Sequence, residues 1–322
     1  MFRKLVFILI TLSLALAACT AASTSPTAVP SAVPSLVPTA APTLDPGISL
    51  TDGLGRSVTL PGPAMRVVSL APSNTEILFA IGAGSQVVGR DETSDYPVAA
   101  QSLPTVGGYS GFNTEAIVAL HPDLVLAGQI NTPEFVASLE QLGLKVYYLQ
   151  NPSTLEEMFT NLETVAQLTG HAADAAALVT SLEARVAAVD NKILPLSNTP
   201  TVYYEIDATD ATKPYTYGPG SFGDLLIRRA GGINIGASLQ GQWAQISLEQ
   251  LVVANPSIII LGDSAYGTSP DSLKLRPGWE GLYAVQNDYI YPFDDNLISR
   301  PGPRMVDGLE ALAKLLHPGQ FK

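Results

Sequence analysis

Short apolar runs alternate with amphipathic stretches from residue 48 to the C-terminus. Runs rich in Val, Ile, Leu and Tyr predict buried strands at 66–70, 86–89, 124–127, 145–149, 201–206, 257–261 and 289–292. Apolar residues with helical spacing predict helices at 73–81, 114–120, 133–142, 222–230, 248–253 and 303–316. Strands that alternate with helices in this way indicate an α/β fold whose sheets are largely parallel.

Turn and capping residues mark the ends of several elements. The four residues at 52–55, Asp-Gly-Leu-Gly, separate two alternating runs and predict a β-hairpin. Ser73 is followed three positions later by Glu76, a capping box that predicts a helix start. Ser153 and Glu156 repeat that spacing, and they predict the start of a second helix.

A long helical stretch lies in the middle of the chain, at 153–191, and Gly170 divides it. Its second part, His171–Val189, is rich in alanine. At 1.5 Å per residue it would be about 28 Å long, which is enough to join two lobes. We therefore expect an N-terminal lobe at 48–151, a helical linker at 152–195 and a C-terminal lobe at 196–322.

An internal repeat indicates that the two lobes are similar. Residues 112–126 align without gaps with residues 246–260, which lie 134 positions later. The alignment and its upstream extension pair Tyr109 with Trp243, Glu115 with Glu249, and Pro122 with Pro256. A shared aromatic, glutamate and proline at one offset favour two related α/β units.

The N-terminus has the pattern of a bacterial lipoprotein leader. Arg3 and Lys4 precede an apolar run to Leu16, which is short for a membrane span. The Leu-Ala-Ala-Cys string ending at Cys19 resembles the lipobox, in which the cysteine is lipidated after cleavage. We expect 1–18 to be a signal peptide and Cys19 to anchor an extracytoplasmic protein to the cell membrane. An ordinary signal peptide with a chance cysteine is the alternative.

The segment at 19–47 differs from the rest in composition. Prolines recur at every fourth residue from Pro26 to Pro46, among Ala, Thr, Ser and Val. Such a sequence cannot bury a core and favours an extended, polyproline-like chain, reaching about 80 Å at about 3.1 Å per residue. We expect a tether that holds the globular body near a membrane surface.

Composition excludes several functions. The net charge of −12 makes the 322-residue chain a poor candidate for binding nucleic acid. One cysteine excludes an intrachain disulfide and a cysteine-based zinc site, and three histidines leave little for a His-rich cluster. Residues 218–223 match GxGxxG, but no acid follows about 20 positions later, so we interpret them as a tight turn. With no Walker motif or nucleophile elbow, we expect no metal, no resident cofactor and no enzyme activity.

Three segments carry a resemblance to a known family: 66–76 (RVVSLAPSNTE), 93–97 (TSDYP) and 113–125 (NTE through PDLV). They resemble the solute-binding proteins of ABC importers for cobalamin, iron-siderophores and haem, and the likeness extends from about Ile48 to the C-terminus. Within that group the cobalamin-binding proteins are the most similar. The resemblance implies two α/β lobes joined by one rigid helix, with the ligand in the cleft between them.

The resemblance also implies a partner. In that family a glutamate on each lobe docks on arginines of the permease dimer, and Glu115 and Glu249 occupy those positions. Two matched charge-assisted contacts would set the register on a symmetric partner. The alternative is that each is a first-turn glutamate favoured by the helix dipole. We expect a monomer that binds a corrinoid and an importer permease.

The ligand-binding residues that the resemblance implies are Tyr109, Trp243, Tyr215, Tyr217, Arg300, Asn296, Ser73 and Thr93. Aromatic side chains would cover the faces of a flat macrocycle, and Arg300 would reach its amide groups. This chain departs from its relatives at Tyr109, where they carry tryptophan, and at Thr93, where they carry tyrosine. Core packing is the alternative for Trp243.

Other ligands and another class of function remain open. A cleft tyrosine could instead coordinate haem iron. Several arginines would suit a ferric siderophore, and Arg90, Arg300 and Arg304 are the candidates. The corrinoid ranks first, the siderophore second and haem third. An extracytoplasmic enzyme acting in the cleft would need convergent carboxylates, for which Asp294 and Asp295 could be considered.

Overall fold

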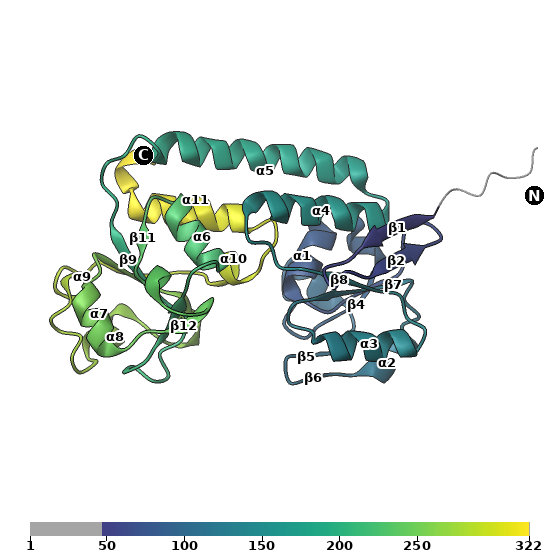
Figure 1. Cartoon of the computed structure of the whole chain (residues 1–322), viewed down its shortest axis with the longest axis horizontal. Coiled ribbons are helices and arrows are strands. Elements are labelled where there is room, and N and C mark those ends of the chain that lie inside the picture. The colour runs from purple at the N-terminus through teal and green to yellow at the C-terminus, as the bar shows by residue number, and fades with distance from the viewer. Residues whose placement is uncertain (1–46, 322) are drawn as a thin grey trace, which may run out of the picture. The chain divides into compact units, whose positions relative to one another are not determined.

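The computed structural model describes residues 47–321 (Figure 1). The expected signal peptide, Cys19 and nearly all of the expected tether lie outside the described residues. Within 47–321, no helix has the length and apolar character needed to cross a membrane.

The N lobe is built on a four-stranded parallel sheet with the order β4-β3-β7-β8. Its strands are β3 (Val67–Ser69), β4 (Val87–Arg90), β7 (Leu124–Gly128) and β8 (Val146–Leu149). Its helices are α1 (Pro72–Ala80), α2 (Thr114–Ala119), α3 (Pro133–Gln141) and α4 (Leu155–Thr169). The expected hairpin is present as β1 (Ile48–Thr51) and β2 (Ser57–Leu60).

The C lobe repeats this plan with a parallel sheet of the order β11-β9-β13-β14. Its strands are β9 (Thr201–Glu205), β11 (Ile233–Asn234), β13 (Ile258–Leu261) and β14 (Ile290–Pro292). Its helices are α6 (Phe222–Arg229), α7 (Leu248–Ala254), α8 (Pro270–Lys274), α9 (Tyr283–Gln286), α10 (Asn296–Ser299) and α11 (Met305–Leu316). In both sheets the first strand lies between the second and third, and the fourth is at the edge. This shared order agrees with the sequence repeat.

Two antiparallel ribbons and five short turns complete the lobes. The ribbons are β5 (Gly107–Gly108) with β6 (Gly111–Phe112), and β10 (Tyr215–Tyr217) with β12 (Trp243–Gln245). The 3-10 turns are η1 (Ala83–Gln86), η2 (Val98–Ser102), η3 (Ile235–Ser238), η4 (Gly262–Tyr266) and η5 (Pro318–Gln320). The sequence pattern predicted neither ribbon, because strands of two or three residues are too short to show a period.

Helix α5 (Ala172–Ile193) is the link between the lobes, and it packs on α4 and on α11 (Figure 1). Gly170 ends α4 in the left-handed region, at φ 81°, so the division of the helical stretch is confirmed. The buried stripe of α5 is Ala175, Val179, Leu182, Val186, Val189 and Ile193. This stripe belongs to one buried cluster that includes residues of both lobes.

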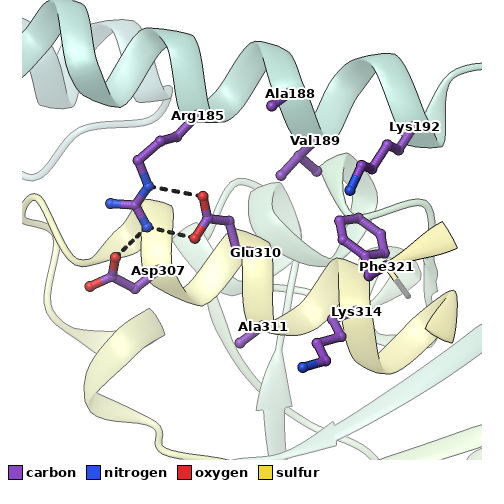
Figure 2. A pocket seen from close by; sticks show the side chains of 9 residues that line it. All are labelled: Arg185, Ala188, Val189, Lys192, Asp307, Glu310, Ala311, Lys314 and Phe321. Carbon is purple, nitrogen blue, oxygen red and sulfur yellow. Dashed lines mark hydrogen bonds and ion pairs between the residues drawn. The ribbon is translucent and has the colours of Figure 1, made fainter.

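Polar contacts reinforce the pairing of α5 with α11. Arg185 lies on α5, and its Nη2 is 2.6 Å from Asp307 Oδ1 and 2.6 Å from Glu310 Oε2 on α11 (Figure 2). These residues line one end of a cavity of about 470 Å³ that continues toward Lys192 and Phe321. Arg185 Nε also donates to Glu310 Oε1 at 2.9 Å, so the guanidinium holds this carboxylate with two parallel bonds and fixes the rotation of α11 against α5.

The start of α1 differs from the capping-box prediction. The helix begins at Pro72, with Ala71 as N-cap and no side-chain cap bond, so Ser73 and Glu76 do not form the predicted box. Proline suits the first helical position because its fixed φ is already helical and its missing N–H would have no partner there. Helix α4 begins one position later than predicted, since Thr154 rather than Ser153 accepts the capping bond from Glu157.

Candidate ligand-binding and docking sites

The β5–β6 ribbon carries Tyr109 at its turn. Its side chain is 92% exposed. Gly107 has φ 93°, and a Cβ there would lie 2.3 Å from the carbonyl oxygen of Gly111, so the tight ribbon requires glycine at 107. The ribbon thus presents one large aromatic ring to solvent, which is the placement that a ligand-contacting residue needs.

The β10–β12 ribbon carries the aromatic residues of the C lobe. Trp243 lies opposite Tyr217 in the ribbon and is 49% exposed. Its indole packs against Tyr217, at 5.4 Å between ring centroids, and against Phe222, at 6.0 Å. Tyr215 is on the same ribbon and is 41% exposed. Trp243 is therefore neither a core residue nor a free surface side chain, because part of it is anchored and part is open.

Tyr217 differs from the expectation of a ligand contact. Its side chain is fully buried, and its hydroxyl donates to Asp295 Oδ1 at 3.0 Å. Burial and the charge of Asp295 raise the pKa of Tyr217. A Cβ at Gly223 would lie 2.1 Å from the Tyr217 ring, so glycine at 223 makes room for that ring. Tyr217 lies beneath Trp243 rather than beside the solvent.

Arg300 also differs from the expectation, because the N lobe already binds its guanidinium. Its Nη1 donates to Asp95 Oδ1 at 2.6 Å and to Glu76 Oε1 at 3.2 Å, and its Nη2 donates to the Thr93 carbonyl at 3.3 Å. Burial would raise the pKa of Asp95, but the hydrogen bond and charge of Arg300 outweigh it and keep that pKa below its usual value. Arg300 thus links the lobes.

Arg304 completes this contact. Its Nε and Nη2 donate to Glu76 at 2.8 and 2.5 Å, and its guanidinium lies 4.0 Å from the centre of the Tyr96 ring. The Glu76 side chain is 1% exposed and the two arginine side chains are 12% and 14% exposed. We call Glu76, Asp95, Arg300 and Arg304 the interlobe ion cluster. Sequence reasoning missed it because partners over 200 residues apart leave no local signal.

The remaining expected ligand residues lie near this cluster or near α10. Ser73 is buried in α1, next to the loop that carries Arg300, and a Cβ at Gly302 would lie 3.5 Å from its carbonyl oxygen. Thr93 is exposed, and its hydroxyl donates to Asp91 Oδ1 at 2.5 Å. Asn296 is partly buried and donates to Asp294 Oδ1 at 2.9 Å.

Arg90, the third arginine candidate, is a structural residue of the N lobe. It is 8% exposed and donates to the carbonyl oxygens of Ala100, Asp91, Glu92 and Gln101. All three arginines that could have received an anionic ligand therefore have protein acceptors.

A cavity of about 350 Å³ lies between the lobes beside the ion cluster. Both lobes and α5 line it, with Phe79, Pro97, Leu178, Leu182 and Pro303 as apolar members. Its lining includes neither Tyr109 nor Trp243. The aromatic ligand cleft expected from the sequence remains a prediction.

The two predicted docking glutamates occupy equivalent places. Glu115 is in the first turn of α2, after the N-cap Asn113, and Glu249 is in the first turn of α7, after the N-cap Ser247. Both side chains are exposed. An exposed carboxylate at a helix N-terminus is favoured by the dipole and is free to receive an arginine from a partner.

Comparison with known proteins gives the class of the molecule. The periplasmic binding protein family matches residues 67–297, and the chain belongs to this family. A vitamin B12-binding protein of Vibrio cholerae is 32% identical over 264 residues, which are 81% of this chain and 92% of that protein.

Two further proteins are similar to this chain over most of its length. An uncharacterized ABC transporter substrate-binding lipoprotein of Bacillus subtilis, YvrC, is 29% identical over 85% of this chain and 87% of its own length. The periplasmic heme-binding protein RhuT from Roseiflexus sp. RS-1, in apo form, has a TM-score of 0.72 at 28% identity, covering 80% of this chain and 99% of its own. The chain is thus a solute-binding protein of the ABC importer class, with two α/β lobes and a connecting helix.

Proposed function

We propose that this protein captures a corrinoid outside the cytoplasm and delivers it to an ABC importer, without catalysing a reaction. The support for a corrinoid among the ligands of this class is the combination of three exposed aromatic side chains on the two ribbons with three arginines whose guanidinium groups are already bonded to carboxylates or backbone carbonyls. The similarity to a vitamin B12-binding protein points the same way.

The aromatic residues support a broad, apolar ligand. Tyr109, Tyr215 and Trp243 are each at least 41% exposed, and they come from both lobes. Exposed rings of this size are costly to leave in water, and covering them with a macrocycle face gains apolar burial at little entropic cost. A corrin ring offers such faces.

The arginines favour a ligand whose side chains are neutral. Haem carries two propionates and many ferric siderophores are anionic, so their binding sites need cations with free hydrogen-bond donors. Here Arg300 and Arg304 donate to Glu76, and Arg90 donates to backbone carbonyls. The amide side chains of a corrinoid need no such counter-charge. Haem or a ferric siderophore is the second candidate, supported by the similarity to RhuT.

The decisive experiment is an absorbance titration of the purified body, residues 47–322, with cobalamin, with haem and with a ferric hydroxamate siderophore. We expect saturable binding of cobalamin at equimolar stoichiometry and weaker or no binding of the other two. Each ligand has its own chromophore, so competition between them can be measured in one cuvette. Saturation by haem or by the siderophore, with none by cobalamin, would replace the corrinoid in this proposal.

Anchoring through a lipid on Cys19 is part of the proposal, and the similarity to a lipoprotein supports it. Replacing Cys19 with serine removes the thiol that would carry the lipid, so the variant protein should move from the membrane fraction to the soluble fraction. Fractionation of cells expressing both forms measures this. A Cys19→Ser protein that remains with the membrane would argue against the lipid anchor.

A further inference from the structure

Asp295 occupies an unusual position under the aromatic ribbon of the C lobe. Its Oδ1 accepts hydrogen bonds from two tyrosine hydroxyls, Tyr204 at 2.9 Å and Tyr217 at 3.0 Å. Both tyrosine rings are fully buried, and their centroids are 5.0 Å apart. Burial raises the pKa of the Asp295 carboxyl group. A carboxylate in such surroundings is stable only with donors held in place, so the two hydroxyls and the acid fix one another.

The tyrosine pair connects Asp295 to the exposed tryptophan. The Tyr217 ring packs against Tyr204, at 5.0 Å between ring centroids, and against the indole of Trp243, at 5.4 Å. The Tyr217 ring packs directly against Gly223 of α6, where a Cβ would lie 2.1 Å from it, so the ring cannot move closer to that helix. The position and orientation of the Trp243 indole therefore depend on the position of the Tyr217 ring. Asp295 fixes that ring by accepting the hydrogen bond of the Tyr217 hydroxyl.

The backbone of the same residue leads to the contact between the lobes. Asp295 is the N-cap residue of α10, and its carbonyl accepts from the Ser299 hydroxyl at 2.9 Å and from the Ser299 amide at 2.8 Å. Arg300 follows Ser299 directly and enters the interlobe ion cluster with Glu76. The side chain of Asp295 thus binds Tyr217, on which Trp243 packs. Its backbone binds Ser299, which precedes the arginine that contacts the N lobe.

We propose that Asp295 is a positioning residue that sets Trp243 for ligand contact and joins this aromatic surface to the interlobe ion cluster. It acts through Tyr217 and Tyr204 and does not touch the ligand. The proposal deepens the proposed function and rests on it for the identity of the ligand. Its structural part, the placement of Trp243 by Asp295, can be tested without any ligand.

The test uses tryptophan fluorescence, because the chain has only two tryptophans and the other, Trp279, is fully buried. Subtracting the spectrum of a Trp243→Phe partner in each background isolates the Trp243 signal. In Asp295→Ala we expect red-shifted Trp243 emission and quenching by acrylamide raised about twofold, since a loosened indole gains water contact. Asp295→Asn keeps an acceptor oxygen at the same place and should give nearly the spectrum of the unmodified protein.

Asp271→Ala is the matched control, because it also removes one acid from the start of a short helix of the C lobe. Its carboxylate is 96% exposed and has no contact with the aromatic ribbon. Cobalamin affinity should fall about tenfold in Asp295→Ala, because the indole of Trp243 is no longer held in place, and should be unchanged in Asp271→Ala. If Asp295→Ala is unstable, the double variant Tyr204→Phe with Tyr217→Phe removes both donors and keeps both rings, and it should loosen Trp243 in the same way.

The outcomes separate the two proposals. Unchanged Trp243 emission and quenching in a folded Asp295→Ala protein, or in the double phenylalanine variant, would overturn the positioning role. Failure of the unmodified protein to bind cobalamin would overturn the ligand and leave the fluorescence result standing. A loosened Trp243 with unaltered cobalamin affinity would show that the position of this ring does not serve binding, and it would also overturn the inference.

Discussion

Two neighbouring aromatic residues of the β10–β12 ribbon differ in exposure, and we infer that they differ in role for this reason. Tyr217 is buried and bonded, whereas Trp243, directly opposite in the ribbon, keeps half of its surface open. A residue that is half covered by protein can hold a fixed orientation and still offer a face to a partner. Tryptophan is also one of the residues most often found to dominate binding energy.

Replacing Trp243 with alanine should therefore weaken binding of the corrinoid by about 2–4 kcal/mol, or about 30- to 1,000-fold. Titration of the purified variant with cobalamin measures this. Tyr266→Ala is a suitable control, because Tyr266 is also an aromatic residue of the C lobe, is 91% exposed and has no aromatic neighbour in the ribbon. Equal affinities of the Trp243 variant and the control would remove the indole from the binding site.

The hairpin carboxylate Asp52 should make the stability of the protein depend on pH in the acid range. Its oxygens accept from the backbone amides of Leu54, Arg56 and Tyr148 and from the Arg56 guanidinium. Burial would raise the pKa of Asp52, but these bonds outweigh it and lower that pKa. A lowered pKa means that the bonds stabilise the protein above the ordinary aspartate range and are lost as the pH falls through the depressed value.

Asp52→Asn should lower the free energy of unfolding by about 1.5–3 kcal/mol at pH 7, the range for a hydrogen bond to a charged group. The difference from the unmodified protein should shrink as the pH falls below about 4. Urea denaturation at several pH values between 7 and 3 measures both effects. A difference that stays constant over this range would show that the Asp52 charge is not responsible.

At the scale of elements, the sequence predicted most of what depends on local chemistry. The hydrophobic period located seven of the eight strands of the parallel sheets, and it also located the principal helices. It did not indicate the two-residue strand β11. The glycine at 170 marked the break between α4 and α5. The prediction was wrong at α1, where Ser73 and Glu76 have the spacing of a capping box but the helix begins at Pro72.

For the candidate site residues, the sequence could indicate which side chains to consider but not what surrounds them. The repeat drew attention to Tyr109 and Trp243, and the structure exposes both side chains. It could not show that Tyr217 is buried or that Arg300 is bonded to Glu76, because those depend on which distant side chains meet in the folded chain. Two residues apart on one ribbon, Tyr215 and Tyr217 have the same local pattern and different surroundings.

Replacement of Glu76 distinguishes a capping role of this residue from its role in the contact between the lobes. Glutamine serves in a capping box as well as glutamate, so Glu76→Gln would be neutral if the residue were only a cap. The structure predicts instead a loss of about 3 kcal/mol in the free energy of unfolding, because two nearly buried arginines lose their shared carboxylate. Urea denaturation measures it. Ser73→Ala, the other half of the supposed box, should have little effect.

At the scale of the whole molecule, the repeated sheet order places corresponding helices on the two lobes. Helices α2 and α7 both end in a loop that leads into the third strand of their sheet, and both carry an exposed glutamate in the first turn. A binding protein with two equivalent acidic points can meet a permease dimer that has two equivalent basic ones. The geometry of such a contact is set by charge and position rather than by buried area.

Replacing Glu115 and Glu249 together with alanine should therefore leave cobalamin affinity unchanged and impair transport. Since rim charges act mainly on the association rate and are screened by salt, the loss of uptake should be greatest at low ionic strength and should shrink as salt is added. The double variant Glu134→Ala with Asp271→Ala is the control. It also removes two exposed first-turn acids, one from each lobe, at places the repeat does not pair. Uptake of labelled cobalamin by cells, beside titration of each purified protein, separates delivery from capture. Equal uptake by the two double variants would mean that net charge, rather than these two glutamates, governs the encounter.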